Sequence, residues 1–476
     1  MTDINHSMAS ALKPEAPYVR RRSSVARVGQ TAIGGDNPVR VQSMTTTNTN
    51  DTEACVAQAK RIIAAGGELV RLTTQGTREA ENMANISAQL KAEGIMTPLV
   101  ADVHFNPAVA DVAATCCEKV RINPGNYVDP ARTFKKLSYD DAEYADEVRK
   151  IEARLLPFLD ICKQHHTAVR IGVNHGSLSD RIMSRFGDTP EGIVESCMEF
   201  LRVCRKADFT DVVLSIKASN TVVMVRSVRL LVEAMDREDM HFPLHLGVTE
   251  AGEGEDGRVR SAVGIGALLT EGLGDTIRVS LSEEPECEIP VARKLVSFIP
   301  ECASLRRTAP IEDGVMRLSL DEDDVEDLML KAAMAAGAPL IDGRATDLVV
   351  TNKGVEQPRL ADSILQAARV RFTHTEFISC PGCGRTLYDL QGTIARIKAA
   401  VSEAAVSLPR LNTLKIAIMG CIVNGPGEMA DADYGYVGAA RRKVSLYRGK
   451  VCVEKNIPEE EAVERLLQLI REDGEA

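Results

Sequence analysis

The sequence predicts an eight-stranded (β/α)8 TIM barrel of the α/β class, followed by a spacer segment and a smaller α+β domain. Between residue 39 and about residue 300, eight short β-rich runs alternate mostly with segments of good helix formers. Eight such units in about 250 residues match a closed barrel in number and in length. An open doubly wound sheet would alternate in the same way, but no glycine-rich dinucleotide motif follows the first run. The missing motif favours the barrel.

The eight expected strands end in polar or charged residues. They are the runs at 39–45, 68–74, 98–103, 119–125, 168–174, 211–218, 244–250 and 276–282. Active sites of such barrels are built at the carboxyl ends of the strands. The sequence therefore directs attention to these ends.

Five of the strand ends carry a cation at a matching position, namely Arg71, Arg121, Arg170, Lys217 and Arg278. For one such residue, a side chain that reaches the surface or pairs with a loop acid is an equally good explanation. Asp102 and Glu250 cannot neutralise all five, and uncompensated cations near a barrel interior are costly. An anionic ligand with several charges is the simpler partner, and guanidinium groups suit phosphate geometry.

The remaining segments complete the predicted organisation around a barrel at residues 39–299. Residues 1–38 are expected to form a mostly flexible leader that ends in a short hairpin-like run. The mixed-charge stretch 126–150 lengthens the connection after the fourth strand and could act as a lid. Residues 300–370 contain helix and strand patterns but no chemical motif, so an insert or spacer is expected. Residues 371–476 alternate strands and helices like a compact α+β domain.

The overall charge excludes some classes of partner. Lys and Arg number 57 against 68 Asp and Glu, which leaves a net charge of −11 and argues against a nucleic-acid binder. No apolar run approaches the roughly 20 residues of a membrane helix. The first residues lack a signal-peptide pattern. A cytoplasmic protein without a membrane partner is expected.

Three of the twelve cysteines lie in glycine- and proline-rich surroundings: Cys380, Cys383 and Cys421. The others lie mostly in helix-like segments, where small buried hydrophobic residues are expected. The Pro-Gly turn between Cys380 and Cys383 directs two sulfurs at one point. Glu428 follows Cys421 by seven residues. Without further information, the sequence predicts a loop carboxylate that points at solvent.

Three chemistries fit this cysteine pattern. A thiol-exchange pair needs no third cysteine. A structural zinc site requires four ligands. The fourth would have to be His374 or Cys452, and neither has the usual spacing from the three cysteines. A [4Fe–4S] cluster accepts thiolates from separate loops, and three cysteines leave one iron for another ligand. The spacing favours the cluster over zinc, and an open iron position would point to catalysis.

Seven motifs resemble a known family when they are taken together. They are CPGCGRT, MGCIVNGPGE, VQSMTTTNTND, VRINPGN, RIGVNHGSL, HLGVTEAG and IRVSLS. The chain resembles the 4-hydroxy-3-methylbut-2-enyl diphosphate synthase family of the non-mevalonate isoprenoid pathway. The motifs cover nearly everything except the leader and the two inserts. The resemblance implies a barrel coupled to a smaller iron–sulfur domain that is similar to sulfite reductase.

The resemblance also implies site residues. Cys380, Cys383, Cys421 and Glu428 would ligate a [4Fe–4S] cluster. The family substrate is 2-C-methyl-D-erythritol 2,4-cyclodiphosphate, whose diphosphate the five barrel cations would hold. Asn174, Ser280 and Ser282 would add hydrogen bonds, and Asp102 and His104 would line the pocket. Glu250 is the candidate for proton handling, although the surrounding cations should favour its ionised form.

The implied reaction is a two-electron reductive ring opening with loss of water, and flavodoxin or ferredoxin would supply the electrons. The exchangeable iron, which Glu428 would otherwise ligate, would take the substrate oxygen. The two inserts resemble the longer three-domain forms of the family. In the compact forms, the cluster domain of one subunit closes over the barrel of the other in a head-to-tail homodimer. A homodimer is therefore expected, although a spacer makes closure within one chain possible.

Two other functions compete with this interpretation. One is a non-redox barrel enzyme, such as a pterin-diphosphate-type condensing enzyme, with an appended structural zinc domain. The other is a non-enzymatic iron–sulfur carrier or sensor. A carrier, however, has no reason to keep a cationic barrel mouth.

Overall fold

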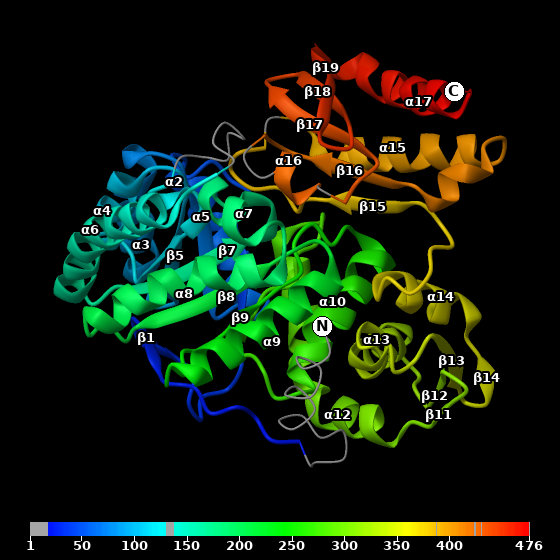
Figure 1. Ribbon diagram of the computed structural model, residues 1–476, viewed down its shortest axis with the longest axis horizontal. Helices are drawn as coiled ribbons and strands as arrows, with labels where there is room; N and C mark the ends of the chain where they lie inside the picture. The colour runs from blue at the N-terminus through cyan, green and yellow to red at the C-terminus, as the bar shows by residue number, and fades with distance from the viewer. Residues whose placement is uncertain (1–17, 130–137, 387, 423–424, 430, 476) are drawn as a thin grey trace.

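The computed structural model describes residues 18–129, 138–386, 388–422, 425–429 and 431–475 (Figure 1). Eight parallel strands form the larger sheet, in the order β8-β7-β6-β5-β4-β3-β10-β9. Their bounds are β3 (Arg40–Met44), β4 (Leu69–Thr74), β5 (Leu99–Val103), β6 (Lys119–Ile122), β7 (Ala168–Asn174), β8 (Val212–Lys217), β9 (His245–Leu246) and β10 (Thr276–Ile277). A parallel bridge between Leu214 and Leu244 joins the two edges. The predicted TIM barrel is confirmed.

Helices cover the outside of the barrel, as the alternating sequence pattern predicts. They are α2 (Thr52–Ala64), α3 (Thr77–Ala92), α4 (Pro107–Ala114), α5 (Pro124–Tyr127), α6 (Asp141–His165), α7 (Asp180–Phe186), α8 (Pro190–Lys206), α9 (Thr221–Arg237), α10 (Gly254–Leu269), α11 (Glu288–Ser297) and α12 (Ile299–Thr308). Short polar residues begin several of them by accepting backbone N–H groups of the first turn, for example Asp51, Asn106, Thr189 and Asn220.

Two of the expected strands are much shorter than their sequence runs. The run 244–250 is a strand only at His245–Leu246, and the run 276–282 only at Thr276–Ile277. Glu250 has a left-handed backbone with a φ of 49°, which a continuing strand does not allow. The chain therefore leaves the sheet early here and forms loops at the barrel mouth.

An N-terminal hairpin closes the other end of the barrel. Strands β1 (Ala26–Val28) and β2 (Thr31–Ile33) pair antiparallel. Their buried side chains pack against the apolar residues that point into the bottom of the barrel, namely Leu69, Val100, Ala168 and Val213. This end of the leader is therefore part of the folded barrel. In the predicted lid at 126–150, residues 130–137 lie outside the described residues.

The segment 300–370 packs directly on the barrel. It forms a small sheet of β11 (Ile311–Glu312), β12 (Val315–Leu320), β13 (Asp347–Asn352) and β14 (Val355–Glu356), with helices α13 (Val325–Ile341) and α14 (Pro358–Ala367). Helix α13 lies against α10 (Figure 1). A Cβ atom at Gly337 would lie 2.6 Å from the carbonyl oxygen of Val263, so the two helices pack backbone against backbone here. The buried residues of the segment and of the barrel form one continuous core.

The C-terminal part folds around a five-stranded sheet in sequence order. Its strands are β15 (Glu376–Ser379), β16 (Lys415–Met419), β17 (Tyr434–Ala440), β18 (Lys443–Arg448) and β19 (Val451–Pro458). Helices α15 (Leu390–Ala405) and α17 (Glu459–Glu475) pack on the face away from the barrel, and the short α16 (Gly425–Glu428) lies on the barrel side (Figure 1). The separate C-terminal α+β domain is confirmed.

This domain lies over the carboxyl ends of the strands of its own barrel. The Ser219 hydroxyl donates to the carbonyl oxygen of Glu428 at 3.0 Å, and Ala251 forms a parallel bridge with Ser379. Arg260 of α10 forms an ion pair with Glu376 of β15 at 3.2 Å. The two halves of one chain therefore close on each other.

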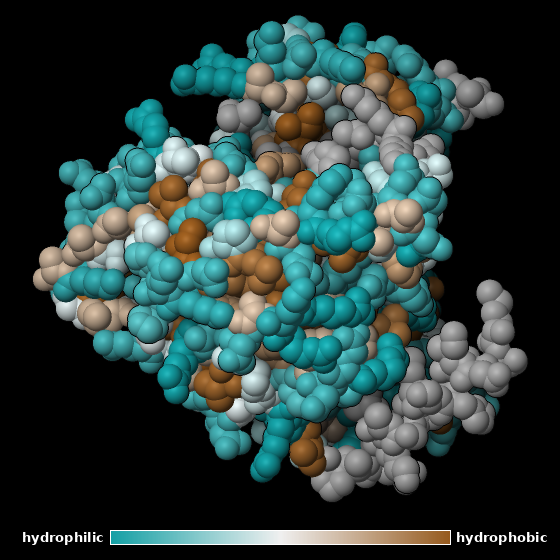
Figure 2. Space-filling view, turned by 60° about the vertical axis from the view of Figure 1, so that its left-hand side comes forward, coloured by the Kyte–Doolittle hydropathy of each residue, from teal (hydrophilic) through white to brown (hydrophobic). Residues whose placement is uncertain are grey.

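The visible surface is mostly hydrophilic, and its hydrophobic residues are scattered over several elements (Figure 2). Among the described residues, no helix is long and apolar enough to cross a membrane.

Candidate active site

A buried cavity lies between the barrel mouth and the C-terminal domain. Thirteen of the residues predicted for the site line it: Arg71, Asp102, His104, Arg121, Arg170, Asn174, Lys217, Glu250, Arg278, Ser280, Cys380, Cys383 and Cys421. The first ten come from the barrel, and the cysteines come from loops of the C-terminal domain. Closure of the domain brings both sets into one space.

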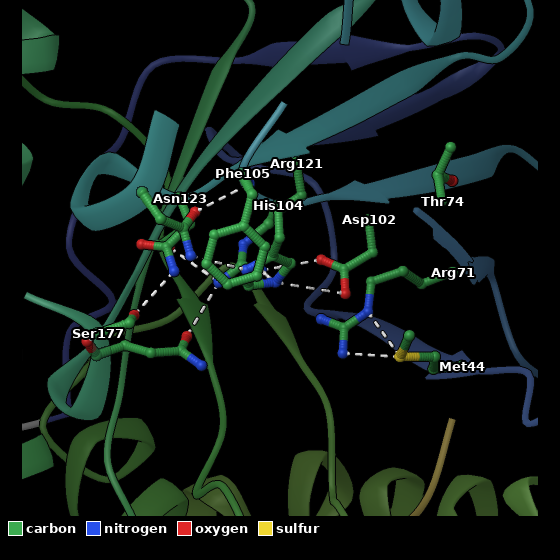
Figure 3. Close-up of polar contacts among 12 residues, drawn as sticks. Met44, Arg71, Thr74, Asp102, His104, Phe105, Arg121, Asn123 and Ser177 are labelled. Atoms are coloured by element: carbon green, nitrogen blue, oxygen red, sulfur yellow. Dashed lines mark hydrogen bonds and ion pairs between the residues drawn. The ribbon is translucent and has the colours of Figure 1, made fainter. Parts of the chain in front are cut away.

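Arg121 is fixed by hydrogen bonds at the centre of this space. It donates to the Asp102 carboxylate at 3.0 Å, to the Gly172 carbonyl oxygen at 2.9 Å and to the Asn174 amide oxygen at 2.9 Å. Its guanidinium also contacts Nε2 of His104 (Figure 3). Nδ1 of His104 lies 3.2 Å from the side-chain amide nitrogen of Asn126. These contacts fix the imidazole of His104 and leave the guanidinium of Arg121 little freedom.

Arg278 forms an ion pair with a second buried acid. Glu288, in the first turn of α11, accepts from Arg278 at 2.8 and 3.0 Å. The Glu288 carboxylate and the charged bonds it accepts raise the pKa of Arg278, although burial works against them. The forked geometry fixes the direction of this guanidinium.

Arg71, Arg170 and Lys217 form no ion pair with any acid in the described parts of the chain. Arg71 instead donates to the sulfur of Met44 at 2.9 and 3.0 Å (Figure 3). Burial, helped by Arg278 and Arg121 and opposed by Asp102, lowers the pKa of Arg71 to about 10. Burial and then four arginines hold the pKa of Lys217 well below its usual value. A bound anion would relieve this mutual repulsion.

The carboxylates of the cavity differ in protonation. Burial acts to raise the pKa of Asp102, but Arg71, Arg121 and their neighbours hold it well below its usual value. Burial raises the pKa of Glu250 in spite of Lys217 and Arg278, which differs from the expectation that the cations favour its ionised form. Burial and the nearby Glu250 raise the pKa of Glu428 strongly. The cavity therefore stabilises the ionised form of Asp102, whereas it shifts Glu250 and Glu428 toward their protonated forms.

Two predicted residues do not line the cavity itself. Ser282 contacts the hydroxyl of Ser379 at 3.0 Å and donates to the carbonyl oxygen of Cys380, also at 3.0 Å, so it joins the two halves of the chain. Its strand end has already left the barrel, which turns this side chain toward the C-terminal domain. Glu428 is buried beside the cavity, and neither of its carboxylate oxygens forms a hydrogen bond of normal geometry with the described residues, although the side chain of Asn174 lies close enough to favour its ionised form. This differs from a carboxylate that points at solvent.

The sulfur chemistry of the cavity comes from three partly buried cysteines. The sulfur of Cys380 accepts a hydrogen bond from the Gly420 amide at 3.2 Å, and burial raises the pKa of its thiol. No three acidic, thiol or imidazole side chains of the described residues converge closely enough to hold a single metal ion. Three soft sulfur donors on one cavity, with the unsatisfied carboxylate of Glu428 nearby, are a donor set that suits an iron–sulfur cluster with one oxygen ligand.

Sequence reasoning missed two charged residues of the site. Arg385 belongs to the CPGCGRT motif, yet it reaches the barrel and donates to the carbonyl oxygen of Asp102 at 3.3 Å. Glu288 follows Arg278 by ten residues on the next helix. The available signals were weak: Arg385 lies inside a cysteine motif, and Glu288 lies in the first turn of a helix. Their contacts with Asp102 and Arg278 depend on the tertiary fold.

Family comparisons cover most of the chain. The model described as "GcpE TIM-barrel domain" matches residues 23–293, and "GcpE protein C-terminal domain" matches residues 376–472. A protein of Bacteroides thetaiotaomicron named "4-hydroxy-3-methylbut-2-en-1-yl diphosphate synthase (flavodoxin)" is 51% identical, over 96% of this chain and 98% of its own length. Its namesake from Akkermansia muciniphila is 40% identical over 96% of this chain and 97% of its own.

Two further comparisons describe length and fold. The alignment with the Bacteroides protein runs over 609 positions, more than the 476 residues of this chain, so that relative carries segments that this chain lacks. Among solved structures, dihydropteroate synthase from Burkholderia cenocepacia is 15% identical with a TM-score of 0.39, covering 60% of this chain and 98% of that chain.

Proposed function

The chain belongs to the GcpE family, and on this premise we propose that it converts 2-C-methyl-D-erythritol 2,4-cyclodiphosphate into (E)-4-hydroxy-3-methylbut-2-enyl diphosphate. The reaction opens the ring reductively with two electrons and releases water. One observation of this structure supports the proposal most directly. One cavity joins Arg71, Arg170 and Lys217, which form no ion pair within the described parts of the chain, to three cysteines of another domain.

The cations would bind the diphosphate. Arg71, Arg170 and Lys217 have no acid of their own and would supply the net positive charge, since charge-assisted hydrogen bonds to phosphate are strong. Arg121 and Arg278 are already oriented by Asp102 and Glu288 and would fix the position of the phosphates. His104, Asn174 and Ser280 line the same cavity and would add neutral contacts.

Cys380, Cys383, Cys421 and Glu428 would hold a [4Fe–4S] cluster. When bound, such a cluster supplies electrons one at a time and a Lewis-acidic iron. Glu428 is the exchangeable member in this proposal, because it would be the single oxygen donor beside three thiolates and its carboxylate is buried next to the cavity.

Glu250 would handle the proton that leaves with water. It lines the cavity, and burial favours its protonated form, so it can donate to a departing hydroxyl group. Asp102 stays ionised and would orient Arg121 rather than transfer a proton.

We further propose flavodoxin as the electron donor, since the relatives carry that word in their names, with ferredoxin as the alternative, and a cytoplasmic location. The expected homodimer is not needed to complete the cavity, because both halves come from one chain. A dimer stays a prediction that light scattering of the purified protein tests.

The decisive experiment is anaerobic purification followed by iron, sulfide and zinc counts and a turnover assay. Roughly four irons and four sulfides per chain are expected, with product detected by mass spectrometry when a reductant and the cyclic diphosphate are supplied. Zinc without iron or sulfide would overturn the cofactor. Cluster-loaded protein that makes no product from the cyclic diphosphate would overturn the activity.

A further inference from the structure

A second set of polar side chains lies inside the barrel, below the cavity. Gln42 and Lys119 each precede a cavity-lining residue of the same strand, Met44 and Arg121, by two positions, and Thr276 of β10 precedes cavity-lining Arg278 by two positions. Because side chains of a strand alternate between its two faces, all three point into the barrel. They form a layer one step further from the mouth.

His245 belongs to the same layer. It precedes Gly247 by two positions, and a Cβ atom on Gly247 would lie 3.2 Å from Nζ of Lys217, which lines the cavity. Nδ1 of His245 lies 3.4 Å from the hydroxyl oxygen of Thr276. When that hydroxyl donates to Nδ1, the neutral imidazole carries its hydrogen on Nε2.

The layer is closed off from water on both sides. Gln42 and Lys119 are 0% exposed, and His245 and Arg170 are 1% exposed. Below lies the apolar plug formed by the β1–β2 hairpin and the inward residues of four strands. Arg170 forms the upper boundary of the layer and belongs both to it and to the lining of the cavity.

Most polar atoms of this layer have no hydrogen-bond partner among the residues that the structure describes. They are Nζ of Lys119, Nε and Nη1 of Arg170, Nε2 of His245, and both amide atoms of Gln42. All of them except the amide oxygen of Gln42 can donate hydrogen. A water molecule both donates and accepts hydrogen bonds, so water bound among so many donors would leave its own hydrogens without enough acceptors. A group that only accepts hydrogen bonds matches an excess of donors better.

The charged groups around the layer are also almost all positive. The neighbours that act electrostatically on Lys119 are Arg170, Arg71 and the thiol of Cys117, and none of them is a carboxylate. Those that act on His245 are Arg170, Lys217, Lys119 and Arg71. Burial, and then the neighbouring arginines, hold the pKa of Lys119 and of Arg170 well below their usual values, because buried cations that lack a counter-charge are costly. A bound anion would restore their charged forms.

We propose that this layer binds one small monovalent anion of chloride size, held by Lys119, Arg170, His245 and Gln42. The anion would accept the unsatisfied hydrogens and reduce the repulsion between Lys119 and the cations above it. Arg170 would be shared, with one part of its guanidinium on this anion and another facing the cavity. The site does not depend on the reaction or on the cluster, and it stands if the proposed function fails.

The first test uses crystals of the full chain grown with sodium bromide in place of chloride. Anomalous diffraction should show one bromide within hydrogen-bond distance of Nζ of Lys119. Crystals of the Lys119→Met variant should lack this peak. Ordered water without anomalous signal at this position in the wild-type protein would overturn the proposal.

A second test needs no crystals. The protein is transferred into chloride-free buffer, then unfolded, and the released chloride is measured by ion chromatography. About one chloride per chain is expected from the wild type and from Lys150→Met, a surface control on α6. Lys119→Met, or Lys119→Gln if the first variant does not fold, should release none. Wild-type protein that releases no chloride would contradict the site.

Discussion

Arg385 of the C-terminal domain lies on Asp102 of the barrel, with Nη1 3.7 Å from the carboxylate and Nη2 donating to the carbonyl oxygen at 3.3 Å. Arg385 also lines the cavity and is 7% exposed. One guanidinium therefore contacts the strand end that orients Arg121 while it lies two residues from Cys383. This contact links the position of the cysteine loop to the arrangement of the barrel cations.

We predict that Arg385→Gln lowers turnover by about tenfold or more, because a buried carboxylate loses a charged partner worth roughly 1.5–3 kcal/mol. The loss of a cation near the thiolates should also make the cluster harder to reduce, which a redox titration measures. Arg385→Lys should restore part of the potential. The matched control is Arg396→Gln, whose side chain is 56% exposed on the same domain. A potential equal to that of the wild type in a cluster-loaded Arg385→Gln protein would argue against this role.

The Arg278–Glu288 pair should be important for stability. Glu288→Ala leaves a buried guanidinium without its acid, and breaking such a pair costs about 3–5 kcal/mol. Urea unfolding should show this loss, and substrate affinity should fall because Arg278 loses its direction. Glu286→Ala, at a more exposed pair with Arg61, should change the free energy of unfolding by less than about 1 kcal/mol. Equal effects of both variants would contradict the prediction.

The pH dependence of turnover should report Glu250. Burial raises its pKa, and the proposed donor is its protonated form, so kcat should fall as the pH rises through that raised pKa. The same shift means that its contribution to stability is present at low pH and is lost as the pH rises from the ordinary to the raised pKa. Glu250→Gln should lower kcat and remove this limb of the profile. An unchanged limb in the variant would assign it to another group.

Cluster loading and substrate binding should be separable by mutation. Cys421→Ser should lose most of its iron and its brown colour, whereas Cys452→Ser, outside the cavity on β19, should keep both. Arg71→Ala should keep the iron and weaken substrate binding about 10- to 100-fold, which corresponds to about 1.4–2.7 kcal/mol. Normal iron content in Cys421→Ser would remove this cysteine from the proposed ligand set.

Close packing between the halves of the chain should be sensitive to one methyl group. A Cβ atom at Gly176 would lie 2.1 Å from the backbone of Gly427, so Gly176→Ala cannot close in the same way. Turnover should fall at least about tenfold while iron content stays normal, and small-angle scattering should report a more extended chain. A compact, fully active variant would show that this contact is not required.

The barrel and most of its site residues could be predicted because they depend on local sequence. Strand runs follow a two-residue period, and parallel topology brings the strand ends to one face, which placed Arg121 beside Asp102. The position of Arg385 depends instead on how one domain closes over another. Glu288 could not be assigned to Arg278 without the path of the chain between them.

The spacer was hard to predict for a related reason. Helix α13 is buried along most of its length, so its sequence lacks the polar face that marks a surface helix. Small residues such as Gly266 and Gly337 allow it to pack closely on α10, but their role is visible only once both helices are placed together.

Closure of the two halves within one chain has a consequence for experiments that mix proteins. Because the barrel cations and the cysteines of one site come from the same polypeptide, the fraction of complete sites should not change when the protein is diluted. Two inactive variants, one damaged at Arg71 and the other at Cys421, should therefore fail to complement each other in a mixture or in a cell. In a cell that also makes the intact protein, either variant should be recessive.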